Sequence, residues 1–149
     1  LSGVWVRWFV LGAVLHLAMT MLGSRGTSTS AYNLTAWASM PFAVRAIVQL
    51  AAMLAGRVLI ANPGLSGFLP QDAAGGLLFA RLLLAAIDIY LIWQIVLLWI
   101  GARASGLPRG KALAGVLISV LLLAAVGAGL QFLVAQVAGL SVDGPMFLF

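Results

Sequence analysis

Few residues of this 149-residue chain could do chemistry, and the most unusual of them is Asp88. It falls near the middle of a long apolar stretch, residues 75–100, where an ionised carboxylate without a partner costs several kcal/mol in a membrane. Such a residue is expected to face the interior of a helix bundle and to find a polar partner there. Judged by depth along the chain alone, the candidate partners are His16, Gln49, Gln131 and Arg81. Arg81 is the doubtful one, because its side chain should lean away from Asp88 toward the outer surface.

Asp88 has two interpretations. As a functional group it would belong to a proton or ion relay across the membrane. As a structural group it would be protonated or hydrogen-bonded and would hold neighbouring helices together, and this second interpretation is favoured. Asp88, His16, Gln49 and Arg81 together define the intramembrane polar site that the sequence predicts.

His16 lies inside the first apolar stretch and is the one histidine of the chain. A histidine in a membrane can ligate haem iron or the magnesium of a chlorophyll, which would make the chain a pigment-binding subunit. One histidine gives at most one axial ligand, and the residues that usually orient such a ligand cannot be identified. A hydrogen-bonded structural histidine is therefore the favoured interpretation, and no cofactor is predicted.

The residues needed for catalysis or for a metal site are missing from the sequence. Glutamate and cysteine are absent, and the acidic residues are Asp72, Asp88 and Asp143. The serines have no nucleophile elbow around them, and no glycine loop ends in the lysine that would hold a phosphate. We expect neither an enzyme nor a metal-binding protein.

The elements that must position these residues are transmembrane helices. Hydrophobic residues make up 64% of the chain and charged residues 7%, against about 25% charged residues in a soluble domain. Four apolar segments are each long enough to cross about 30 Å of hydrocarbon as a helix. The sequence therefore predicts an all-α, polytopic transmembrane bundle that forms one domain over residues 1–149, with spans near residues 4–22, 39–61, 75–100 and 112–138.

The basic residues predict the orientation of the chain. The net charge of +5 is scattered rather than clustered, so nucleic-acid binding is not expected. Arg103, Arg109 and Lys111 lie in one connection between spans, where they should contact lipid head groups or a partner, and Arg45 should snorkel to the same surface. Loops 23–38 and 101–111 are predicted to be cytoplasmic, with the C-terminus outside.

Two stretches resemble the membrane domain of the Yip family, the Rab/Ypt-interacting membrane proteins and their prokaryotic relatives. One is the run from Asp88 through Trp99 to a basic turn, within residues 87–112, and the other is the aromatic-Ala-Ser-x-Pro helix start at residues 36–41 after a Gly/Ser/Thr-rich loop. The resemblance covers roughly residues 23–120. It implies a five-span protein with a cytosolic N-terminus, so the family's N-terminal segment and first span would precede the residues seen here.

The sequence and the resemblance together predict a non-enzymatic protein of a prokaryotic cytoplasmic membrane that docks with lipids and other membrane proteins. Two alternatives stay open. One is a small transporter or channel component that uses Asp88, and the other is an accessory subunit of a photosynthetic or respiratory complex, with a pigment on His16.

Overall fold

The computed structural model describes residues 2–56, 64–70 and 74–138, and within these residues the chain is helical without a strand. The elements, in chain order, are α1 (Ser2–Met21), α2 (Ser28–Ala38), α3 (Met40–Gly56), the 3-10 helix η1 (Gly64–Phe68), α4 (Gly76–Ala85), α5 (Ile89–Ala104) and α6 (Arg109–Ala138). The predicted all-α class is confirmed.

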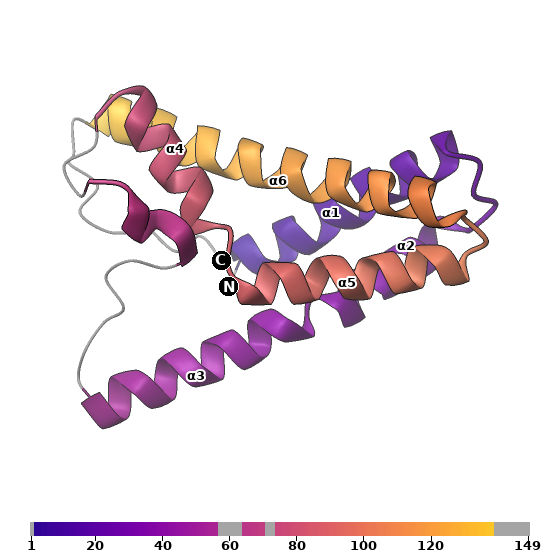
Figure 1. Cartoon of the computed structure of the whole chain (residues 1–149), viewed down its shortest axis with the longest axis horizontal. Coiled ribbons are helices and arrows are strands. Elements are labelled where there is room, and N and C mark those ends of the chain that lie inside the picture. The colour runs from indigo at the N-terminus through magenta and orange to yellow at the C-terminus, as the bar shows by residue number, and fades with distance from the viewer. Residues whose placement is uncertain (1, 57–63, 71–73, 139–149) are drawn as a thin grey trace.

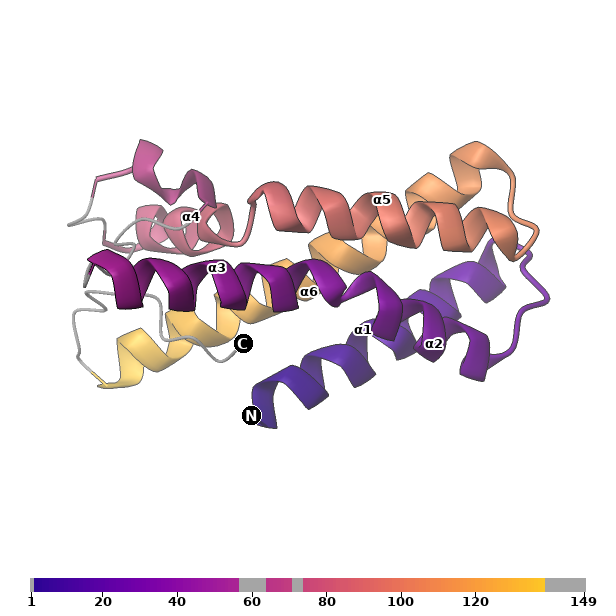
Figure 2. The ribbon, with the colours of Figure 1, turned by 90° about the horizontal axis from the view of Figure 1, so that it is seen from below.

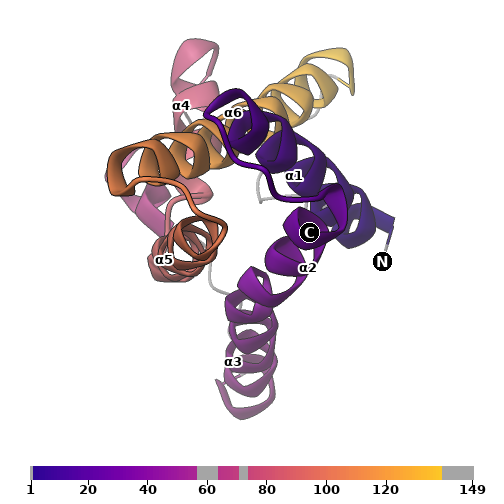
Figure 3. The same ribbon diagram turned by 90° about the vertical axis from the view of Figure 1, so that its right-hand side faces the viewer.

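Four of these helices form the packed part of the molecule. The α1–α2 and α5–α6 connections lie at the same end, on the right in Figure 1. α1 packs against α2 and α6, and α5 packs against α6 and α2. Seen from that end, α3 extends away from the other helices (Figure 3). The helix that α3 mainly packs against is α5. At the opposite end α4 packs against α6 and η1 (Figures 1 and 2).

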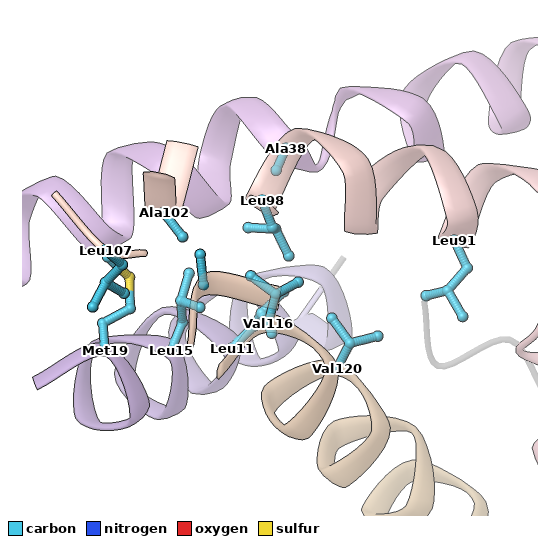
Figure 4. Packing of buried hydrophobic residues seen from close by; sticks show 11 residues of the cluster. Leu11, Leu15, Met19, Ala38, Leu91, Leu98, Ala102, Leu107, Val116 and Val120 are labelled. Carbon is cyan, nitrogen blue, oxygen red and sulfur yellow. The ribbon is translucent and has the colours of Figure 1, made fainter. Parts of the chain in front are cut away.

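The core is built from apolar residues that recur every three or four positions on the facing sides of these helices. Such spacing places side chains on one helix face, so each helix presents a stripe to the centre. Leu15 of α1, Leu98 of α5 and Val116 of α6 are all completely buried in it. Figure 4 shows these side chains converging from α1, α5 and α6, with Leu91 and Val120 continuing the cluster toward the other end.

The outer surface is also apolar. Large side chains such as Leu54 on α3 (76% exposed) and Val137 on α6 (89% exposed) point away from the core. In water such a surface would drive association, whereas lipid tails solvate it. The chain is therefore an integral membrane protein.

The structure gives the number of helices directly, but the number of membrane crossings follows from it less directly. Two helices are long and apolar enough to cross, Ser28–Ala55 and Arg109–Val137, and the pair α4–α5 makes a third if it counts as one span. Trp5–Met21 is a shorter apolar helix. Helices thus lie over all four predicted spans. Residues 57–61 of the second span are outside the described residues. The four crossings and the limits of each span stay a prediction.

The segment 28–38, predicted as part of a loop, is instead the helix α2. Its polar residues satisfy the backbone rather than disrupt it: Thr27 caps the helix through the Ser30 N–H, and Thr35 Oγ1 donates to the Ala31 carbonyl at 2.8 Å. The face with Ala31 and Thr35 is buried, and α2 packs on α1 and α5. Tertiary burial of one narrow face makes a helix out of a Ser/Thr-rich sequence.

Candidate functional site: an intramembrane charge cluster and a basic end

The predicted third span contains a sharp break immediately before Asp88. α4 ends at Ala85 and α5 begins at Ile89, and the two helices are bent by 64°. Asp88 is the N-cap of α5, with its Oδ1 accepting the Leu91 N–H at 2.8 Å. The prediction that Asp88 lies inside a continuous helix is wrong, because aspartate stabilises a helix start more than it tolerates a helix interior.

Several backbone groups at this break have hydrogen-bond partners within the protein, which matters in a membrane because lipid tails supply none. The last turn of α4 closes with a bond from the Ile87 N–H to the Leu84 carbonyl at 3.1 Å. The Ile87 carbonyl then accepts the Leu65 N–H of η1 at 3.1 Å. The break is therefore a defined structure in which η1 supplies the partner that a continuous helix would have supplied.

The second oxygen of Asp88 forms an ion pair with a residue that the sequence did not single out as its partner. Arg45 Nη1 of α3 lies 2.8 Å from Asp88 Oδ2, and the two side chains are only 18% and 11% exposed. The prediction that Arg45 snorkels toward the basic surface is wrong. A carboxylate at this depth attracts the guanidinium more strongly than distant head groups do.

Arg7 of α1 joins this pair. Its guanidinium carbon lies 4.2 Å from the centre of the Phe42 ring, in a cation–π contact. It also interacts electrostatically with both Arg45 and Asp88. We call Arg7, Phe42, Arg45 and Asp88 the charge cluster. It joins α1, α3 and the α4–α5 break, and it contains two guanidinium groups and one carboxylate.

The residues predicted as partners of Asp88 are spread over several helices. Gln49 is one turn beyond Arg45 on α3, and Arg81 is on α4, across the 64° bend. His16 is partly buried on α1, about two and a half turns from Arg7. Gln131 lies in the second half of α6. No group of three His, Cys, Asp or Glu that could hold a metal occurs among the described residues.

Sequence reasoning missed one more polar residue, Gln94. It is 1% exposed, on the same face of α5 as Leu91 and Leu98, and neither its Oε1 nor its Nε2 has a hydrogen-bond partner within the described part of the chain. A buried amide without partners costs about 1–3 kcal/mol. The spacing of Gln94 from Leu91 and Leu98 puts all three on one helix face, and this signal in the sequence could have predicted that Gln94 is buried.

The other predicted residues do come together, at the end of the molecule formed by the α1–α2 and α5–α6 connections. Lys111 Nζ donates to the Leu22 carbonyl at 3.5 Å, at the C-terminus of α1. Trp99 Nε1 donates to the Arg109 carbonyl at 3.2 Å, and the Arg103 guanidinium lies 5.6 Å from the Trp99 ring.

These three basic side chains are exposed, as is Arg25 in the α1–α2 connection. We call Arg25, Arg103, Arg109 and Lys111 the basic end. Asp88, at the other end of α5, is the one acidic residue in the described part of the chain. The field at the basic end is therefore positive, with Trp99 beside it.

Comparison with known proteins agrees with the resemblance noted above. A family model described as the Yip1 domain matches residues 1–130. Neither a search of curated proteins nor a search of solved structures found a match.

Proposed function

Since this chain belongs to the Yip1 domain family, we propose that it is a non-enzymatic integral membrane protein that docks with anionic lipids and with other membrane proteins through its basic end. The observation that carries the proposal is the convergence of Arg103, Arg109 and Lys111 on the α5–α6 connection beside Trp99. The outer faces of the helices are apolar and suited to lipid tails.

The chemistry of the basic end fits a head-group surface. Each Lys or Arg near an anionic surface contributes about 1 kcal/mol of attraction. Tryptophan is enriched at the same depth, because its ring is amphipathic. The basic residues support an orientation with the basic end in the cytoplasm and the C-terminus outside, because cytoplasmic loops carry an excess of Lys and Arg. As part of the proposal, the membrane is a prokaryotic cytoplasmic membrane.

The contacts of Asp88 favour this proposal over the transporter alternative. One carboxylate oxygen caps α5 and the other pairs with Arg45. A relay group has to exchange its proton with a pathway, whereas Asp88 is engaged in holding α3 and α5 together. In this proposal Asp88 is a structural residue. The pigment-binding alternative rests on His16 alone, and a visible absorption spectrum of the purified protein tests it.

Quenching of Trp99 by brominated lipid tests the proposal. The variant keeps Trp99 and has phenylalanine in place of the other tryptophans. In phosphatidylcholine vesicles, brominated phosphatidylglycerol should quench the fluorescence of Trp99 more strongly than brominated phosphatidylcholine does, and the ratio of the two is the lipid preference. Substitution of Arg103, Arg109 and Lys111 by glutamine should weaken this preference about fivefold for each charge removed. Arg81→Gln, at the other end of the bundle, is the matched control.

Equal quenching by the two lipids, or an unchanged preference in the triple variant, would overturn the lipid part of the proposal. Purification at native abundance in mild detergent tests the protein part. Co-purifying membrane proteins that are lost on substitution of the basic end support it, and a chain that comes away alone contradicts it.

A further inference from the structure

The basic end contains one residue that contacts two of its cations. We propose that Trp99 is the positioning residue of the basic end, and that it aligns Arg103 and Arg109 on the phosphate of a single anionic phospholipid. The inference rests on the proposed function and deepens it, because it makes lipid selection depend on a fixed geometry rather than on the number of charges alone.

Trp99 contacts the two arginines in different ways. Its Nε1 donates a hydrogen bond to the backbone carbonyl of Arg109 at 3.2 Å, across the turn between α5 and α6. The guanidinium carbon of Arg103, about one turn further along α5, lies 5.6 Å from the centre of the Trp99 ring, in a cation–π contact. One indole therefore fixes the backbone of Arg109 and the side chain of Arg103 relative to each other.

The indole of Trp99 is itself held by the core. Trp99 is partly buried and packs against the hydrophobic cluster, and its neighbour in the chain, Leu98, is completely buried. An indole has an apolar body and one polar N–H, so the body can pack in the core while the N–H reaches the turn. A side chain that packing holds in this way can keep its neighbours in a binding geometry.

Arg103 and Arg109 can be reached by an anion, because both side chains are exposed. Asp88, the one acidic residue in the described part of the chain, lies at the other end of α5 and pairs with Arg45. A guanidinium presents its N–H groups as a fork that matches two phosphate oxygens, whereas an ammonium is a point charge. Two guanidinium groups held near one ring can therefore select a phosphate by geometry as well as by charge.

The neighbouring surface favours a lipid as the source of the phosphate. Val96 and Ile100 precede Arg103 on α5 and are 43% and 55% exposed. Leu113 follows Arg109 on α6 and is 41% exposed. Both helices thus carry exposed apolar side chains on the membrane side of the arginines, where they can contact the acyl chains of a lipid whose phosphate binds the arginines. A tryptophan ring at this boundary fits the depth of a head group.

Replacement of both arginines by lysine separates geometry from charge. The double variant Arg103→Lys/Arg109→Lys keeps Trp99 and the net charge, so its lipid preference can be measured by quenching of Trp99 with the same brominated lipids. We expect the preference to fall about tenfold, the effect of losing a charge-assisted contact to the phosphate. An unchanged preference would overturn the inference, since charge alone would then account for the selection.

Trp99→Phe removes the hydrogen bond to the Arg109 carbonyl and keeps an aromatic ring beside Arg103. Because this variant lacks the reporter, native mass spectrometry of the protein in mild detergent should be used, with the ratio of the affinities for phosphatidylglycerol and phosphatidylcholine as the readout. We expect Trp99→Phe to lower this ratio about fivefold, the factor that one neutral hydrogen bond contributes. Trp93→Phe, on the same helix and 46% exposed, is the matched control and should leave the ratio unchanged.

A double-variant cycle tests whether Trp99 acts through Arg109. In a chain that carries Arg109→Gln, Trp99→Phe should have little further effect on the affinity ratio. In a chain that carries Arg25→Gln, in the other connection of the basic end, Trp99→Phe should keep its full effect. An equal effect of Trp99→Phe in the parent chain and in Arg109→Gln would show that Trp99 acts on the bundle as a whole, and it would overturn the positioning role.

The same measurements separate this inference from the proposed function and identify the source of the phosphate. A parent chain that prefers phosphatidylglycerol, with the same preference in the lysine variant and in Trp99→Phe, would overturn the inference while the proposed function stands. Equal affinities of the parent chain for the two lipids would overturn both. Inorganic phosphate at millimolar concentration should not displace the bound lipid, and displacement by it would overturn the assignment to a lipid.

Discussion

Removal of the Asp88 charge leaves Arg7 and Arg45 facing each other without a carboxylate in the cluster, and the cost of this change can be worked out from the structure. Asp88→Asn keeps the cap of α5, because asparagine is as good an N-cap as aspartate. Breaking a buried ion pair by removing one partner costs about 3–5 kcal/mol. The side chains of the pair are 18% and 11% exposed, so we expect the lower end of that range, about 3 kcal/mol of unfolding free energy.

The matched change on the other side of the ion pair should cost less. Arg45→Met leaves Arg7 and Asp88, one charge of each sign, which already interact electrostatically. The cluster is then neutral, and we expect a loss of about half as much, 1–2 kcal/mol. Asp88→Ala removes the cap as well and should cost about 1 kcal/mol more than Asp88→Asn.

Reversible unfolding in mixed micelles of increasing SDS content, followed by tryptophan fluorescence, measures these differences. In the double variant Asp88→Asn/Arg45→Met the loss should be smaller than the sum of the single losses, because both remove the same interaction. If Arg45→Met costs as much as Asp88→Asn or more, Arg7 does not share the carboxylate, and the reasoning about the charge cluster fails.

Three further predictions concern the packing of the helices. Gln94→Leu should raise the unfolding free energy by about 1 kcal/mol or more in the same assay, since it removes a buried amide without partners; a destabilised variant would show that Gln94 has a partner in the membrane. Gly12→Ala should lower the unfolding free energy by about 1–3 kcal/mol, because the new Cβ would fall against the ring of Tyr32. Gly129→Ala, with open space around the new Cβ, should be neutral or stabilising. Equal effects of the two changes would contradict the close α1–α2 contact. Thr27→Ala should cost about 1 kcal/mol through loss of the α2 cap while Thr27→Ser should not, and a melting temperature unchanged in both variants would place the start of α2 elsewhere.

The sequence by itself determined the class of protein and one of its two charged regions. A surface with so few charges can be solvated only by lipid, and long apolar runs in lipid have to be helices, because each backbone group needs a partner within its own segment. Arg103, Arg109 and Lys111 could be placed together because they flank one short connection. Local spacing decides such features, and the sequence shows local spacing directly.

The partner of Asp88 was decided by the tertiary structure. The cost of a buried carboxylate requires a partner, but depth along the chain left His16, Gln49, Gln131 and, as the doubtful one, Arg81 as candidates. Arg45 became the partner because α3 packs against α5 with Arg45 beside the break, whereas the sequence had placed Arg45 at the opposite surface. Ion pairing between residues far apart in the chain depends on helix packing, which hydropathy does not encode.

The local shape of the third segment was decided in the same way. Residues 82–88 contain neither proline nor glycine, so the apolar run was expected to continue as one helix through Asp88. The break exists because three separate groups stabilise it: the Asp88 cap, the Leu65 N–H from η1, and Arg45 from α3. The Asp88 cap is a local contact with Leu91, whereas the contacts of Leu65 and Arg45 form only when distant segments pack together. The sequence thus determined which residues need partners, and the packing of the helices determined which partners they have.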